Sequence, residues 1–217
     1  MTMKKLLLAA VLLAGTAIAT PASALTWNFG EHGFGALPSV QQFDVGGDFF
    51  LTAKGFGAGN LAAALYSKND GPGEVGLGFN GLVDHEISGN NFIQLNLDGL
   101  LSRLTNFSFS MDSVDNSEGW VVYGSNDANP FTFTQLAHSI GTLDNGVHSL
   151  AGGWDNYSFF FAPSGVGGPT GNNDVLLHSF SAELQAVPIP PALALFGAGL
   201  AGIGWITRRR KKSLDVA

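Results

Sequence analysis

Apolar and polar residues alternate in short segments of this chain, and between residues 25 and 186 no long segment repeats its apolar residues with the period of a helix. In residues 106–111 the alternation is strict, since Phe107, Phe109 and Met111 are separated by serines. A period of two places the apolar side chains on one face, which is typical of antiparallel strands that cover a core. We expect strands at residues 25–29, 49–53, 62–67, 92–97, 106–111, 120–124, 131–136, 157–162 and 175–184.

Turn-forming residues separate these segments. Glycine, asparagine, aspartate and proline favour turns, and they cluster at residues 69–73, 88–91, 125–130, 144–146 and 165–173. About nine short strands with this spacing predict an all-β fold, a single antiparallel β-sandwich of the jelly-roll kind. Residues 59–66 are the exception, because they fit either a short helix or a strand.

Aromatic rings are frequent, with 17 phenylalanines and four tryptophans. At alternating positions of strands such rings are expected in the core. Trp120 and Trp154 each follow a glycine, where a loop could instead expose the ring for stacking on a sugar. We expect both in the core. Exposure of Trp27, Trp120 and Trp154 would favour a carbohydrate-binding role, and their burial would favour a structural one.

The first 24 residues have the three parts of a secretory signal peptide. Two lysines precede an apolar run at residues 6–18, and Ala22 and Ala24 form a small-residue cleavage site. The run is shorter than the roughly 20 residues that a membrane span requires. We therefore expect export by the secretion machinery and cleavage before Leu25.

Residues 25–186 are strongly acidic. They contain three basic residues, Lys54, Lys68 and Arg103, against sixteen acidic ones, which gives a net charge of about −13. A surface of this sign repels phosphate backbones, so we expect no nucleic acid partner. It favours solubility, and it would attract cations such as Ca²⁺ or basic partners.

The sequence offers little support for a metal site. The chain has no cysteine, and its five histidines lack the spacing of zinc ligands. Asp84, His85 and Glu86 are consecutive, so in a strand they would face alternate sides, and we interpret them as a solvated strand start. Asp70 and Glu74 belong to a glycine-rich segment without the order of an EF-hand. We expect no cofactor, with a structural Ca²⁺ at Asp70, Glu74, Asp84 and Glu86 as a secondary hypothesis.

No motif assigns an enzymatic activity. The chain lacks G-x-S-x-G, and Gly76-x-Gly78 is followed by neither a third glycine in register nor a helix. The paired carboxylates of a glycoside hydrolase are neighbours in space rather than in sequence, and no pair stands out here. We assign no catalytic residue and do not expect an enzyme, and a surface hydrolase is the least favoured alternative.

An apolar segment followed by five basic residues lies near the end of the chain. Residues 192–206 contain no charge, and counting from Val187 extends the run to 20 residues, about 30 Å of helix and enough to cross a bilayer. Prolines at 188, 190 and 191 place the helix start near Ala192. A basic cluster stays in the cytoplasm, so the preceding domain would face outward. The cluster is Arg208, Arg209, Arg210, Lys211 and Lys212, and residues 213–217 are a short tail.

The order of motif, apolar helix and basic cluster at residues 187–212 resembles the PEP-CTERM sorting signal of Gram-negative bacteria, in its V-P-x-P-A variant. The resemblance implies that an exosortase, a membrane-embedded cysteine transpeptidase, removes this tail while the protein is sorted to the cell surface or the polysaccharide matrix. The matching residues are Val187, Pro188 and Pro190 in the motif and Leu195, Phe196, Gly197, Gly199, Gly202, Gly204 and Trp205 in the helix.

Two positions depart from the family pattern. Ile189 replaces the glutamate of the family name, and Pro191 stands where the variant has alanine. Both leave the cleavage position open. Within the domain, residues 76–97 and 119–125 are similar to a pattern of exported proteins with this tail, which implies a shared β-sandwich and no activity.

These features predict a signal peptide at 1–24, an exported β-sandwich at 25–186 and a sorting signal at 187–212. We expect transient anchoring in the inner membrane and a final location at the cell surface or outside the cell, in the envelope, exopolysaccharide or biofilm. The expected role is structural or adhesive. A carbohydrate-binding module, with or without Ca²⁺, is the alternative.

Overall fold

The computed structural model describes residues 23–31, 33–114, 118–125, 134–140, 146–150, 158–163, 174–185, 196–197 and 199–203. The chain divides into a compact unit at residues 23–185 and a second unit made of both ends, 1–22 and 186–217. The predicted signal peptide up to Ala22 and most of the predicted sorting signal lie outside the described residues.

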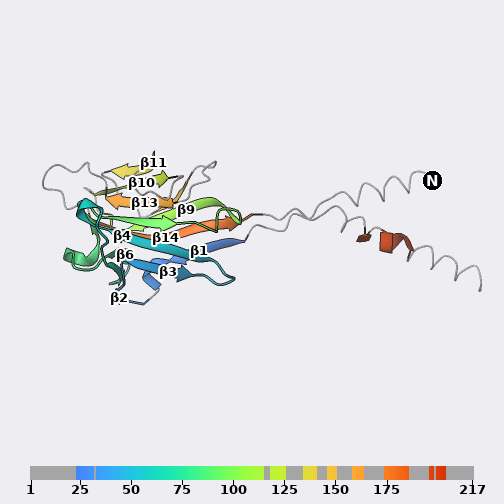
Figure 1. Cartoon of the computed structure of the whole chain (residues 1–217), viewed down its shortest axis with the longest axis horizontal. Coiled ribbons are helices and arrows are strands. Elements are labelled where there is room, and N and C mark those ends of the chain that lie inside the picture. The colour runs from blue at the N-terminus through green and yellow to red at the C-terminus, as the bar shows by residue number, and fades with distance from the viewer. Residues whose placement is uncertain are drawn as a thin grey trace, which may run out of the picture. The chain divides into compact units, whose positions relative to one another are not determined.

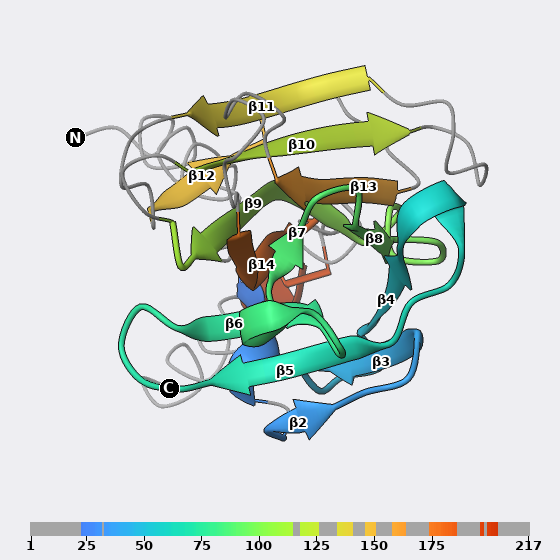
Figure 2. The same ribbon diagram turned by 90° about the vertical axis from the view of Figure 1, so that its left-hand side faces the viewer.

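Two antiparallel sheets form a β-sandwich in residues 23–185, and Figures 1 and 2 show them as two layers. The all-β sandwich predicted from the alternation is confirmed. The eight-stranded sheet has the order β12 (Val147–Ser149), β9 (Leu104–Asp112), β14 (Asp174–Leu184), β6 (Val75–Phe79), β5 (Leu65–Asn69) and β2 (Gly35–Ala36), with β1 (Ala24–Asn28) and β7 (Ile87–Ser88) also paired to β14. The six-stranded sheet has the order β11 (Thr134–Ile140), β10 (Gly119–Ser125), β13 (Ser158–Pro163), β8 (Phe92–Asn96), β4 (Phe50–Phe56) and β3 (Val40–Asp44).

Three short 3₁₀ turns, η1 (Phe29–Glu31), η2 (Ala58–Asn60) and η3 (Val83–His85), complete the described elements of this unit. The ambiguous segment 59–66 is neither a helix nor one strand. It leaves the turn η2, forms a single bridge between Ala62 and Phe56, and enters β5 at Leu65.

The core lies between the sheets and is built from the alternating apolar residues. In β9 the side chains of Phe107, Phe109 and Met111 are buried, as the strict alternation predicts. Facing strands contribute further rings, and T-shaped pairs such as Phe109 with Trp120, with centroids 5.1 Å apart, fill the space between them. The largest fully buried side chains are Trp27, Trp120, Phe29, Phe43, Phe79, Phe109, Phe159, Phe160, Phe161, Phe180, Leu51 and Leu65.

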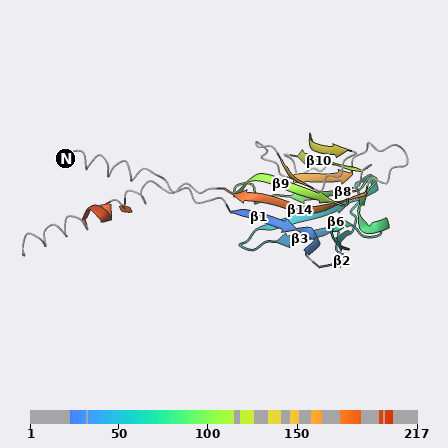
Figure 3. The same ribbon diagram turned by 180° about the vertical axis from the view of Figure 1, so that it is seen from behind.

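Strand β14 organises the eight-stranded sheet. One of its edges pairs with β9 over most of its length, and the other edge is shared by β1, β6 and β7 in turn. Seen from behind, β1, β14 and β9 lie side by side (Figure 3). The last strand of the sandwich is therefore in the interior of its sheet rather than at an edge.

The chain closes one side of the sandwich by crossing between the sheets. Strand β2 pairs with β5 in the eight-stranded sheet, and four residues later β3 pairs with β4 in the six-stranded one. Backbone bonds from Leu37 N to Leu65 O and from Gly55 N to Ser39 O hold the crossing.

Part of the proposed membrane segment is described. Residues 196–197 and 199–203, which include Phe196, Gly197, Gly199 and Gly202, are α-helical. Within the residues that the structure describes, no helix reaches the length and apolar character needed to cross a membrane.

Candidate functional site

Gly78 of β6 allows a loop to fold against the outer face of the eight-stranded sheet. In β6, Val75, Leu77 and Phe79 alternate with Gly76 and Gly78. A Cβ atom on Gly78 would lie 2.1 Å from the carbonyl oxygen of His85 and 2.9 Å from Cα of Glu86. Only a glycine leaves room for this close approach. The G-x-G pattern thus places residues 85–86 directly over the strand.

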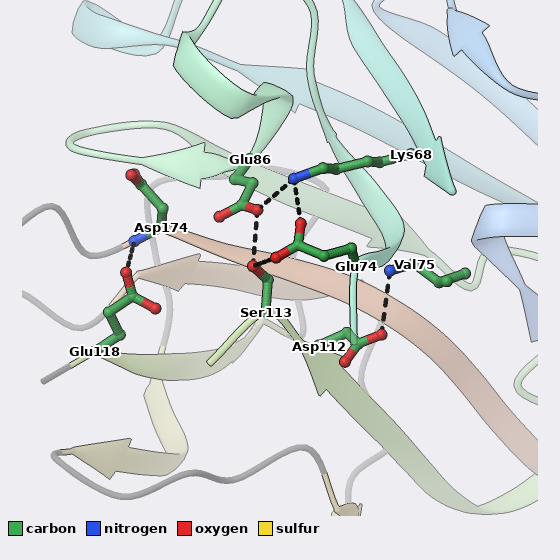
Figure 4. Close-up of polar contacts among 8 residues, drawn as sticks. All are labelled: Lys68, Glu74, Val75, Glu86, Asp112, Ser113, Glu118 and Asp174. Carbon is green, nitrogen blue, oxygen red and sulfur yellow. Dashed lines mark hydrogen bonds and ion pairs between the residues drawn. The ribbon is translucent and has the colours of Figure 1, made fainter. Parts of the chain in front are cut away.

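Beneath this loop, Lys68 of β5 binds two glutamates (Figure 4). Its ammonium donates to Glu74, in the turn before β6, and to Oε1 of Glu86 at 2.7 Å. The Ser113 hydroxyl, directly after β9, lies 3.1 Å from Oε1 of Glu74 and 2.7 Å from Oε1 of Glu86. Lys68 and Glu86 are both buried, whereas Glu74 reaches solvent.

The two carboxyl groups of this Lys68 cluster (Lys68, Glu74, Glu86 and Ser113) differ in proton affinity. Burial raises the pKa of Glu86 to about 7. The charge of Glu74 also acts to raise this pKa, whereas the hydrogen bonds from Lys68 and Ser113 act to lower it. Burial also acts to raise the pKa of Glu74, but bonding to Lys68 outweighs it and the pKa is lowered. Desolvation of Lys68 is likewise outweighed by its two glutamates, so its pKa is raised. With Glu86 protonated, the cluster is neutral overall.

We expect stability to fall as pH rises from about 5 to about 8. In the folded protein Glu86 keeps its proton up to a higher pH than in the unfolded chain. The stabilisation that this bound proton provides is complete below the pKa of Glu86 in the unfolded chain, and it is lost as the pH rises through the pKa of Glu86 in the folded protein. Because Glu86 itself is buried, the shift of its pKa from 4.5 to about 7 corresponds to a change on the order of 3 kcal/mol. Urea unfolding of the wild type and of Glu86→Gln measures it.

The Glu86→Gln variant should lose this pH dependence, because its amide does not titrate. Glu31→Gln, at an exposed position, serves as the control and should keep the wild-type profile. A wild-type unfolding midpoint that stays constant or rises across this interval would contradict the assignment.

The structure separates the four residues of the calcium hypothesis. Glu74 and Glu86 come together, but they face the Lys68 ammonium, while Asp70 and Asp84 are exposed. Among the described residues, no group of three or more histidine or acidic side chains is arranged to hold a metal ion. Glu86 also corrects the interpretation of residues 84–86 as a solvated strand start. Its side chain is buried because it pairs with Lys68, while Asp84 does lie in solvent.

A second set of polar contacts involves β14 and its surroundings (Figure 4). Asp112 accepts from the backbone nitrogen of Val75 at 3.2 Å, and its Oδ2 lies 3.6 Å from Nδ1 of His178. Asp174 N donates to Glu118 at 3.5 Å. Burial raises the pKa of Asp174. A hydrogen bond from Ser88 acts to lower this pKa, and the charge of Asp84 acts to raise it. The contacts of Asp112 join β6, β9 and β14, and the bond between Asp174 and Glu118 joins β14 to the residue before β10.

Trp120 lies in the core, as predicted. Trp27 is 0% exposed and Trp120 is 2% exposed, so neither offers a face to a ligand. Trp154 lies outside the described residues.

A different group of rings consists of one exposed and two half-buried side chains, and the sequence did not single it out. Tyr66 of β5 stacks on His85 with centroids 3.8 Å apart and planes 9° apart. Phe34, just before β2, meets Tyr66 at 5.9 Å and 73°. Phe34 is 62% exposed. The three rings come from segments up to 51 residues apart in the sequence, so no local pattern signals them.

The sorting motif Val187, Pro188 and Pro190 lies outside the described residues, as do Leu195, Gly204, Trp205 and the basic cluster 208–212. Of the signal cleavage site, only Ala24 is described, as the first residue of β1. No protein-family model matches the chain, and no curated protein matches it significantly.

Proposed function

We propose that this protein is exported, sorted to the cell surface or extracellular matrix by an exosortase-like enzyme, and structural or adhesive there. The observation that carries the proposal is the order of motif, apolar segment and basic cluster at residues 187–212, together with the leader at 1–24. As parts of the same proposal, residues 1–24 are a signal peptide, the apolar segment after Pro191 is a membrane helix, and the strands of the sandwich are connected as in a jelly roll.

The burial of Trp27 and Trp120 supports a structural role over a tryptophan-based binding site. Side chains that form the core stabilise the sandwich and leave its faces for contact with other matrix components. The acidic composition of residues 25–186 supports the same role, because a highly charged domain stays soluble during export.

Intact-mass measurement of the surface-released protein tests the sorting step. In cells with the exosortase, we expect the mass to lack the apolar segment and basic cluster, and in cells without it we expect both to remain. Pro188→Ala combined with Pro190→Ala should prevent removal of the tail, because both prolines of the motif are lost.

Pro191→Ala is the matched control, since it restores the alanine of the V-P-x-P-A variant and should leave processing intact. A released protein that retains residues 192–212 whether or not exosortase is present would refute the proposed sorting.

A further inference from the structure

The ring cluster of Phe34, Tyr66 and His85 lies on the outer face of the eight-stranded sheet, with Phe34 exposed and the other two rings half-buried. In the row across that face, Tyr66 is paired with Ala36 on one side and Gly78 on the other. Because both neighbours are small, they leave room beside the Tyr66 ring for other rings to pack against it. His85 stacks against it, and Phe34 approaches it at a steep angle.

The cluster is held in place before any ligand arrives. Asp84 and His85 have φ angles of 59° and 60°, a left-handed conformation that costs non-glycine residues about 1–3 kcal/mol each. Such backbone persists only where the surroundings impose it. Here the backbone of His85 packs directly on Gly78, where no side chain is in the way. The next residue, Glu86, is bound to Lys68, which also holds the loop in place. An ordered set of rings loses little freedom on binding.

The chemistry of the cluster combines apolar ring surface with hydrogen-bonding groups. Phe34 offers a ring that is 62% exposed, and the half-buried rings of Tyr66 and His85 extend the apolar surface beside it. Nδ1 of His85 is buried without a hydrogen-bond partner among the described residues, which leaves Nε2 as the nitrogen able to reach a ligand. Asp84, the preceding residue, is exposed and adds a carboxylate.

The charge of the domain restricts what such a cluster binds. Of its three basic residues, Lys68 is buried between two glutamates and Arg103 lies 3.9 Å above the ring of Phe49. Only Lys54 remains outside these contacts, against sixteen acidic residues in 25–186. An anionic polymer would meet repulsion here and no basic patch.

From these observations we propose that Phe34, Tyr66 and His85 form a platform for a neutral saccharide. The apolar C–H face of a pyranose packs against the rings, while its hydroxyl groups bond to the Asp84 carboxylate and the His85 imidazole. The saccharide would be the binding partner of the protein at the cell surface or in the matrix. This inference therefore rests on the location and role proposed above.

A glycan array probed with the full chain tests this proposal. The protein is kept in a detergent without a sugar headgroup, and the array carries neutral and acidic oligosaccharides. We expect binding to neutral glycans, no binding to uronic-acid or sialylated ones, and an affinity about tenfold lower in Phe34→Ala. Phe34→Trp should bind at least as well as the wild type, and Phe50→Ala, which removes another exposed ring from the opposite sheet, should bind unchanged.

Three outcomes would overturn the platform: no neutral glycan bound by the folded wild type, equal binding by Phe34→Ala, or binding only of a cationic probe such as tetramethylammonium. Circular dichroism of each variant separates lost binding from lost folding. Because the array does not depend on sorting, a chain that binds glycans but keeps its tail in cells with exosortase would refute the proposed function alone. A chain that is processed but binds no glycan would refute the platform alone.

Discussion

Replacing Lys68 by methionine should lower the free energy of unfolding by about 3–5 kcal/mol. The substitution leaves Glu74 and Glu86 facing each other, with the Ser113 hydroxyl as their remaining shared donor. Glu86 is 4% exposed, so water does not replace the lost ammonium there. Removing one partner of a buried ion pair costs more than the pair contributes, because it leaves a charge without compensation. Urea unfolding near neutral pH measures the change.

Two further variants make this result specific. Lys54→Met, on the other sheet, removes a lysine outside the Lys68 cluster and should change stability by no more than about 0.5 kcal/mol. Adding Glu86→Gln to Lys68→Met should restore part of the stability, because only Glu74, which reaches solvent, then remains charged. Equal unfolding midpoints for Lys68→Met and the wild type would contradict the burial of this network.

Phe180→Ala is the second substitution for which we expect a large loss, about 3–5 kcal/mol. Phe180 is 0% exposed in β14, and its ring lies 5.6 Å from Phe159, 5.8 Å from Phe107 and 6.2 Å from Trp27. Truncation would leave a cavity where strands of both sheets meet. The loss is a large part of the about 5–15 kcal/mol that stabilises a typical domain.

Chemical unfolding followed by tryptophan fluorescence measures this effect, since Trp27 contacts the Phe180 ring. Phe180→Leu keeps part of the volume and should lose only about 1–2 kcal/mol, which gives a measurable value if the alanine variant does not fold. Phe50→Ala, at a ring 47% exposed, is the matched control and should be nearly neutral. A Phe180→Ala protein as stable as Phe50→Ala would show that the core is packed differently.

The strands with clean alternation could be predicted from sequence, and those rich in glycine could not. The period of two in residues 106–111 is found in β9, and Trp120 is buried in β10 as expected. Strand β6 was overlooked because Gly76 and Gly78 interrupt its apolar pattern. Gly78 leaves room for the loop at His85 and Glu86, and Gly76 leaves room for the backbone of β14 at Leu177, and both approaches are visible only in three dimensions.

The Lys68 cluster was beyond sequence reasoning for a related reason. Glu86 is 18 residues from Lys68 and 27 from Ser113, and no spacing rule connects a strand, a loop and the end of another strand. An acidic residue in sequence is expected at the surface. Its burial follows from a single lysine on a neighbouring strand, and the same folded loop carries His85 to Tyr66.

The interior place of β14 also sets the time at which this domain folds. Strands β1, β6, β7 and β9 all pair with it, so the eight-stranded sheet stays incomplete until the last eleven residues of the sandwich are available. Pairing strands that are this far apart in sequence is slow. A chain that has been only partly exported along the proposed route would therefore lack the strand that β1, β6, β7 and β9 share, so its eight-stranded sheet could not be completed outside the cell until residues 174–184 had followed.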